Sequence, residues 1–449
     1  MQFSEDIKHV NIKKDFKECY ENPQELIMFL KETFKIFENG KVYKIDATTE
    51  ALQLIEKYLY HFVQLSSSHK EEFAEVVTEL YRSLRNCTTN KHVQDFIVEN
   101  TNILQTTQHY IKTSNPLHLC LKIILQFLIN LISSNLVASK KVYSEFLDFV
   151  KNLMEHKMYT YECSALIYNM SLFNPIDMNL FEMMLNLEEC ETQNEFICFF
   201  LEKCISDDCF WSFYKGLRHK HKLTILNIIR TYQIQNKDFN IPDSGLEILI
   251  DCFLRSPDIF FKITNVYKQD EVQEVSLLLG VLSSISSKDK YIDKLQQNKN
   301  ILVTASALLI NFHRLGKSGN NSFTPVQKLS GSQSDEAANP VFGLKADLIQ
   351  LIGNMCWKNN IMKNLAREAE VIPVILDCCN IDANNPFIIQ WCIFAIRNLC
   401  ENNPENQKMI GGLQKKGTVS SSVLEEFGLT LQGDNDTQLK IVPLDSLQS

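Results

Sequence analysis

The chain has 449 residues, a length at which a single compact core gives way to several domains or to a stack of repeats. Its apolar content of 45% excludes a globally disordered chain, and its scarcity of glycine (14) and proline (11) favours helices over strands. The formal net charge of −9 argues against general nucleic-acid binding, which needs an excess of Lys and Arg facing phosphate.

The sequence from residue 4 to about residue 316 predicts one helix after another. The stretch Val142–Leu153 is an example, because its apolar residues recur at the spacing of one helix face. Short breaks such as Asn115-Pro116 separate the helices, since proline suits a first helical turn and disfavours helix in the residue before it. We therefore expect an all-α protein.

The best candidate for a membrane span is Leu117–Leu131. However, His118, Lys122, Gln126 and Asn130 repeat every four residues and form a polar stripe on one helix face. The stretch is also too short to cross a bilayer. It predicts the central helix of a large core, and the sequence predicts a soluble protein without membrane insertion.

The 14 cysteines are spread singly through apolar helical contexts such as Leu119-Cys120-Leu121. The segment Met1–Phe16 is charged throughout and lacks the apolar core of a secretory signal. Reduced, mostly buried thiols in a cytoplasmic protein are the expectation.

A short helix signature occurs twice near the C-terminus at a fixed distance. Ile352–Cys356 and Ile396–Cys400 both read apolar-x-Asn-apolar-Cys, and Asn354 and Asn398 lie 44 residues apart. This period is typical of armadillo and HEAT repeats, whose helices bury their apolar faces against neighbouring repeats. The expected architecture is an armadillo/HEAT-like α-solenoid, which functions by binding along an extended surface.

The apolar-x-Asn-apolar marker also recurs upstream. Successive markers are separated by 44, 39, 58, 84, 43 and 44 residues. The spacing leaves the repeat register open between about residues 231 and 289. The upstream asparagines are Asn86, Asn130, Asn169, Asn227 and Asn311.

The segment 316–341 differs from its surroundings, because it is rich in Gly, Ser and Asn and has almost no apolar periodicity. We expect a flexible, disordered loop inserted into one solenoid, since Asn311 and Asn354 keep the repeat interval across it. A divide between two independent domains is the alternative. The expected organisation is N-terminal repeats over 1–315, the loop over 316–341, C-terminal repeats over 342–412 and a tail over 413–449.

The tail predicts a small β-hairpin. Leu429–Leu431 and Gln438–Val442 are strand-like and flank Gly433–Asp436, which has the composition of a turn. An isolated hairpin is marginally stable in water, so we expect it to lean on the last helix pair.

Residues 342–407 resemble the conserved C-terminal domain of the ataxin-10 family, and Leu84–Cys87 is similar to that family's first repeats. The resemblance implies an armadillo-like cytoplasmic protein without catalysis. It also implies links to cytokinesis, to centrosomes and ciliary bases, and to neurite growth, with perinuclear, centrosomal or midbody localisation. The matching stretches are Leu348–Cys356, Ile372–Asp382, Asn384–Ile388, Ala395–Leu399 and Glu401–Gln407.

Partial chemical motifs do not add up to a catalytic or metal site. Gly316-Lys317-Ser318 resembles the end of a P-loop, but the glycine that a P-loop needs upstream is missing. A P-loop also joins a strand to a helix, whereas this segment follows a predicted helix and enters a loop. Cysteines and histidines over residues 204–221 do not have zinc-finger spacing, and Cys378-Cys379 is better explained by core packing. No hydrolase, metalloprotease or kinase motif is present. We expect no enzyme activity, no metal and no cofactor.

The asparagine markers admit two interpretations. They could hydrogen-bond the backbone of an extended partner peptide, or they could bridge helices inside the repeat, which the cost of burying an unpaired amide favours. Large aromatic and basic side chains nearby are the better contact candidates, because Trp and Arg dominate binding hot spots. The candidate partner-binding groove comprises Asn354, Trp357, Lys358, Trp391, Arg397 and Asn398.

The sequence as a whole predicts a non-enzymatic scaffold or adaptor that presents a concave surface to other proteins. The alternative from another class is an accessory subunit of an RNA- or nucleotide-dependent enzyme that uses a helical-repeat face. Self-assembly through terminal repeats into a homo-oligomer is a third hypothesis.

Overall fold

The computed structural model describes residues 23–34, 45–66, 72–114, 116–176, 178–188, 194–234, 240–257, 269–319, 321–326, 341–413, 429–434 and 438–443. Helices make up almost all of these residues, so the all-α prediction is confirmed. The chain divides into two compact units, Met1–Cys204 and Ile205–Ser449, each of which has its own helix packing.

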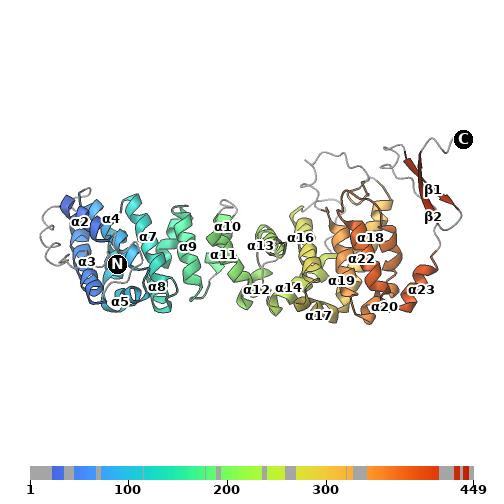
Figure 1. Cartoon of the computed structure of the whole chain (residues 1–449), viewed down its shortest axis with the longest axis horizontal. Helices are drawn as coiled ribbons and strands as arrows, with labels where there is room; N and C mark the ends of the chain where they lie inside the picture. The colour runs from blue at the N-terminus through green and yellow to red at the C-terminus, as the bar shows by residue number, and fades with distance from the viewer. Residues whose placement is uncertain are drawn as a thin grey trace, which may run out of the picture. The chain divides into compact units, whose positions relative to one another are not determined.

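In the first unit, three inner helices pack side by side in the order α4, α7, α9 (Figure 1). The apolar stretch expected as a central helix is α7, and Ile124, Leu128 and Leu131 are fully buried in it. Among the helices that the structure describes, none is long and apolar enough to cross a membrane. The helices of this unit are α2 (Pro23–Phe34), α3 (Ile45–Ser66), α4 (Glu72–Cys87), α5 (Lys91–Asn100), α6 (Ile103–Thr113), α7 (His118–Ile132), α8 (Leu136–Glu155), α9 (Thr160–Ser171), α10 (Met178–Glu188) and α11 (Glu195–Ile205).

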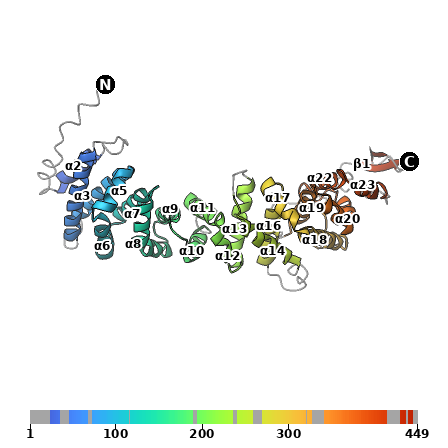
Figure 2. The same cartoon turned by 90° about the horizontal axis from the view of Figure 1, so that it is seen from below.

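The second unit has an inner row of its own, in which α13, α16, α19 and α22 pack in succession (Figure 2). The outer helices α18, α20 and α21 cover this row from one side. The helices are α12 (Asp208–Tyr214), α13 (His219–Ile234), α14 (Asp243–Leu254), α16 (Gln269–Ile285), α17 (Asp289–Gln297), α18 (Lys299–Lys317), α19 (Leu344–Met355), α20 (Asn360–Glu368), α21 (Val371–Asp377), α22 (Ile388–Cys400) and α23 (Pro404–Gly411).

Several inner helices end in the same turn. After α7, α19 and α22 one residue adopts the left-handed conformation: Ser134 (φ 55°), Lys358 (φ 52°) and Asn402 (φ 51°). The next residue is always an asparagine, whose side chain accepts a backbone N–H and so caps the following helix. In each case this turn leads from an inner helix into the next helix along the chain, which is α8, α20 or α23.

The segment expected to be a flexible loop begins later than the sequence predicts. Gly316 and Lys317 belong to α18, and Phe323 stacks on Phe312 with 4.5 Å between ring centroids. The carbonyl of Phe323 accepts a hydrogen bond from Lys345 Nζ at 2.7 Å. The boundary expected at residue 316 is therefore wrong, because packing continues to Val326; residue 320 and residues 327–340 lie outside the described part.

Two strands follow the helices. β1 (Leu429–Asp434) pairs antiparallel with β2 (Gln438–Pro443), and Leu431 lies opposite Ile441. Gly433 and Asp434, expected in a turn, belong to β1, while the rest of that expected turn lies outside the described residues.

Candidate functional site

Asparagine amides join consecutive inner helices by one repeated hydrogen bond. In each case the side-chain nitrogen donates to a carbonyl of the preceding inner helix, and the accepting residue directly precedes that helix's own marker asparagine. The bonds run from Asn130 to Arg85 (2.9 Å), from Asn169 to Ile129 (3.4 Å) and from Asn398 to Gly353 (2.9 Å).

Asn354 reveals the correct repeat register. Its amide donates to Ser286 Oγ at 2.9 Å and to the Ser283 carbonyl at 3.4 Å, both of which follow from the packing of α19 on α16. By the rule of the other markers, Ser284 holds the marker position in α16. Asn311 instead bonds the Ala307 carbonyl of its own helix, α18.

The expected 43-residue interval between Asn311 and Asn354 is therefore wrong as a repeat interval. Ser284 stands in α16 where the other inner helices carry an asparagine, and the segment after α18 lengthens this repeat to 70 residues, from Ser284 to Asn354. Asn311, the marker in the outer helix α18, lies 43 residues before Asn354 by coincidence, since α18 is not part of the inner row.

The two groove asparagines are buried. Asn354 is 6% and Asn398 is 3% exposed, and both amide nitrogens are used within the helix stack. A buried amide that already donates to a neighbouring helix has little to offer an extended peptide. This geometry favours the structural interpretation of the markers over a direct role in binding.

Trp357 and Lys358 form an exposed pair at the turn after α19. Lys358 Nζ lies 4.3 Å from the centroid of the Trp357 indole ring, and the indole is 37% exposed. The carbonyl of Trp357 accepts a hydrogen bond from Gln296 Nε2 at 2.9 Å, which holds the turn against α17. A cation over an indole face at a fixed turn is a well-defined contact surface for a partner.

Trp391 and Arg397 lie on different parts of α22. The half-buried indole of Trp391 meets Phe394 edge to face at 5.9 Å, whereas Arg397 is exposed and occupies the repeat position that Gly353 holds in α19. Within the described residues, no hydrogen bond, ion pair or ring contact joins Trp357, Trp391 and Arg397. The structure thus pairs Trp357 with Lys358 and does not bring all six candidates together.

A charged group that the sequence did not single out lies on the inner row of the second unit. Asp347 of α19 accepts a hydrogen bond from Ser283 Oγ at 3.4 Å, and both Asp347 and Arg230 of α13 border Gly280. Burial raises the pKa of the Asp347 carboxyl to about 6, and the charge of Arg230 opposes this shift. The absence of a side chain on Gly280 leaves room for this carboxylate.

We expect Asp347→Asn to stabilise the second unit above about pH 6. The folded chain binds more protons than the unfolded chain between the ordinary carboxyl pKa and the raised one, so stability falls as pH rises through that window. The gain of the variant should grow from near zero at about pH 4 to at most about 3 kcal/mol at about pH 7. Urea unfolding followed by tryptophan fluorescence at both pH values measures it.

Asp251→Asn provides the control for this prediction. A hydrogen bond from Lys215 lowers the pKa of Asp251, so removing this carboxylate should give no gain at neutral pH. Equal stability changes for the two variants at every pH would contradict the proposed burial of Asp347.

One group of side chains has the order of a cysteine-dependent catalytic triad. It comprises Cys378 as the nucleophile, His313 as the base and Asp377 as the carboxylate. Cys378 Sγ lies 3.3 Å from His313 Nδ1, and His313 Nε2 lies 2.8 Å from Asp377 Oδ2. However, Cys378 is only 7% exposed, and burial raises its thiol pKa to about 12, so the thiolate is disfavoured. Burial also lowers the pKa of His313. The row is best explained as packing between α18 and α21.

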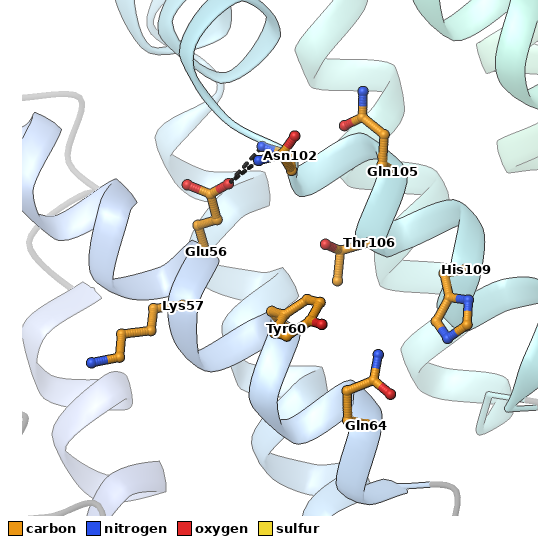
Figure 3. A pocket seen from close by; sticks show the side chains of 8 residues that line it. All are labelled: Glu56, Lys57, Tyr60, Gln64, Asn102, Gln105, Thr106 and His109. Atoms are coloured by element: carbon orange, nitrogen blue, oxygen red, sulfur yellow. Dashed lines mark hydrogen bonds between the residues drawn. The ribbon is translucent and has the colours of Figure 1, made fainter.

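A surface pocket of about 560 Å³ lies between α3 and α6 in the first unit. Tyr60 lies near its centre, and Glu56 at its edge accepts hydrogen bonds from the backbone and side chain of Asn102 (Figure 3). The side chain of Lys57 points away from the other lining groups (Figure 3). Most of the lining surface is apolar, and amide and hydroxyl groups supply hydrogen-bonding atoms at its edges.

Sequence reasoning placed every contact candidate in the C-terminal repeats and missed an aromatic group in the first unit. There α9 and α11 carry clustered aromatic rings, two of which are well exposed. Within the described residues, no group of three or more His, Cys, Asp or Glu is placed to hold a metal ion.

Comparison with known proteins relates the chain to one family. The family model described as the spinocerebellar ataxia type 10 protein domain matches residues 344–442. Ataxin-10 of Xenopus tropicalis is 38% identical over 183 residues, which is 40% of this chain and 37% of the relative.

Similar matches come from distant eukaryotes. Ataxin-10 of Homo sapiens is 31% identical over 188 residues, covering 41% of this chain and 39% of the relative. An ataxin-10 homolog of Dictyostelium discoideum is 45% identical over 87 residues, covering 19% and 14%. The chain matches less than half the length of these relatives.

Proposed function

The chain belongs to the ataxin-10 family, and from this we propose that it is a non-enzymatic scaffold that binds partner proteins on its helical-repeat surfaces. We further propose that it works in cytokinesis, at centrosomes or ciliary bases, or in neurite growth. The corresponding location is the cytoplasm, with the perinuclear region, centrosome or midbody as sites of action.

The observation that carries the proposal is the exposed Trp357–Lys358 pair on a turn that the fold holds in place. Gln296 binds the Trp357 carbonyl, and Asn359 caps the next helix immediately after the turn. A contact residue that is already fixed loses little conformational entropy when a partner binds, so more of the contact energy appears as affinity. A rigid stack with such fixed contacts suits an adaptor.

Arg397 is the second proposed contact on this unit. Its guanidinium is exposed on α22, where it can pair with a carboxylate of a partner in a bidentate geometry. Asn354 and Asn398 are left out of the proposed contact set because they serve the helix stack.

The test is affinity purification with cross-linking from dividing cells, comparing the wild-type chain with the double variant Trp357→Ala/Arg397→Ala. We expect recovery of at least one partner to fall about tenfold, since hot-spot truncation costs about 1–2 kcal/mol or more. Arg397 is exposed and Trp357 is 37% exposed, so the double variant should stay folded, which circular dichroism and urea unfolding check.

Phe213→Ala/Arg255→Ala is the matched control. It removes an exposed phenylalanine (43%) and an exposed arginine elsewhere in the same unit. Partner lists that are identical for the wild type and both variants would reject the proposed contact surface.

A further inference from the structure

Four aromatic rings form a cluster between α9 and α11 in the first unit. Tyr161 and Tyr168 come from α9, and Phe196 and Phe199 come from α11. The centroid distances are 5.2 Å for Tyr161–Phe196, 6.3 Å for Tyr168–Phe196, 5.7 Å for Tyr168–Phe199 and 6.2 Å for Phe196–Phe199. We call these residues the α9–α11 ring cluster.

The cluster is not part of the hydrophobic core. Tyr161 is 50% and Phe199 is 39% exposed, while Tyr81 of α4 and Phe127 of α7 are fully buried in the same row of helices. Phe200, which follows Phe199, already supplies the core contact of α11. Exposed rings that pack on each other at a surface are a feature of binding sites, because an isolated unit gains little from them.

Carboxylates border the rings. Glu195 and Glu202 lie four residues before and three residues after Phe199 on α11, so one helical face carries all three side chains. Glu195 accepts a hydrogen bond from the Tyr161 hydroxyl at 3.5 Å. Glu202 has no ion-pair partner among the described residues.

The basic side chains nearby do not neutralise both carboxylates of α11. Lys122 lies 3.2 Å from the buried carboxylate of Glu162 and balances it. Lys203, four residues after Phe199, lies on the same helical face and offsets one of the two carboxylates, so one negative charge remains beside the rings. The faces of aromatic rings are also electron-rich, so both kinds of group attract a cation.

We propose that the α9–α11 ring cluster binds a partner polypeptide through an arginine or lysine side chain flanked by apolar residues. The cation would lie against the ring faces with a carboxylate of α11 nearby, and the apolar neighbours would cover the exposed rings. This surface belongs to the unit Met1–Cys204, so it does not depend on the contact residues proposed for the other unit.

The test uses the full chain and immobilised short extended peptides whose central residue is arginine, lysine, norleucine or glutamate between leucines. Arginine and lysine peptides should bind at least about fivefold more tightly than norleucine peptides, given a cation–ring contact of about 1 kcal/mol at a partly exposed site. Norleucine has the length of lysine without its charge, so equal binding of the two would overturn the proposal. No binding of any peptide would overturn it as well.

Leucine variants separate ring chemistry from apolar area. Tyr168→Leu/Phe199→Leu should abolish the preference for arginine and lysine, and Glu202→Gln should weaken it and reduce its salt dependence. Phe213→Leu, an exposed ring outside the cluster, should change nothing. If the leucine variant stays helical and keeps the full preference for basic peptides, the rings are not the binding site.

Discussion

Replacing Asn354 and Asn398 together by alanine is expected to lower the free energy of unfolding of the second unit by about 2–6 kcal/mol. Each amide lost removes a buried hydrogen bond, to Ser286 Oγ just after α16 in one case and to the Gly353 carbonyl of α19 in the other. The Ser286 hydroxyl still donates to the Ser283 carbonyl, but both acceptors lose a buried partner. Each such loss costs about 1–3 kcal/mol. The two positions lie on adjacent helices, so the double loss need not equal the sum of the single losses.

Urea unfolding followed by tryptophan fluorescence measures this effect, since Trp211, Trp357 and Trp391, the three tryptophans of the chain, all belong to the second unit. Asn311→Ala is the matched control, because this asparagine has the same flanking pattern but bonds the Ala307 carbonyl and the Arg314 guanidinium, both in its own helix. A double variant no less stable than the Asn311 control would show that the amide bonds do not hold the inner row together.

Gly353→Leu is expected to cost about 3 kcal/mol, the upper end of the range for overpacking a core. A Cβ at this position would lie 3.0 Å from both Cα and Cβ of Ala395 and 3.3 Å from Phe394 Cδ1. The first of these atoms belongs to the backbone, so α22 must move away from α19 to make room. Glycine inside a helix ordinarily costs about 1 kcal/mol relative to alanine, and here the close approach of two helices explains its presence.

The same substitution at Gly411 is the control, since nothing lies within 4 Å of a Cβ placed there. Circular dichroism together with the fluorescence titration should show a lower unfolding midpoint for Gly353→Leu and an almost unchanged one for Gly411→Leu. Equal midpoints would mean that α19 and α22 tolerate a larger separation than their contact suggests.

The sequence predicts the inner helices well because two local signals coincide there. Asn398 carries the apolar-x-Asn-apolar marker, and five residues later Asn403 caps the next helix. Asn354 and Asn359 repeat the pair, as do Asn130 and Asn135. The spacing of marker and cap depends only on the turn between them, so a sequence pattern can report it.

The repeat interval from Asn311 to Asn354 was predicted wrongly, because the sequence does not show whether a marker asparagine lies on an inner or an outer helix. Asn311 has the right neighbours, but its helix α18 is an outer one, and no local pattern distinguishes the two. In the same way, the ring cluster joins residues of two helices whose relative approach is set by packing. The pairing of Trp357 with Lys358 could be anticipated, because the two are neighbours in the chain and share a turn.

The position that Arg397 shares with Gly353 bears on how closely successive inner helices approach each other. In α19 this position must be empty of side chain for the next inner helix to settle against it, and in α22 it carries a long cationic one. The same position holds Arg85 in α4 and Ile129 in α7, and the next inner helix still donates its marker amide to these residues. The amide bond therefore tolerates a large side chain beside it, whereas the approach of α22 to α19 requires glycine. A change at this one position can thus alter the spacing of a single helix pair while the bond that joins the pair is kept.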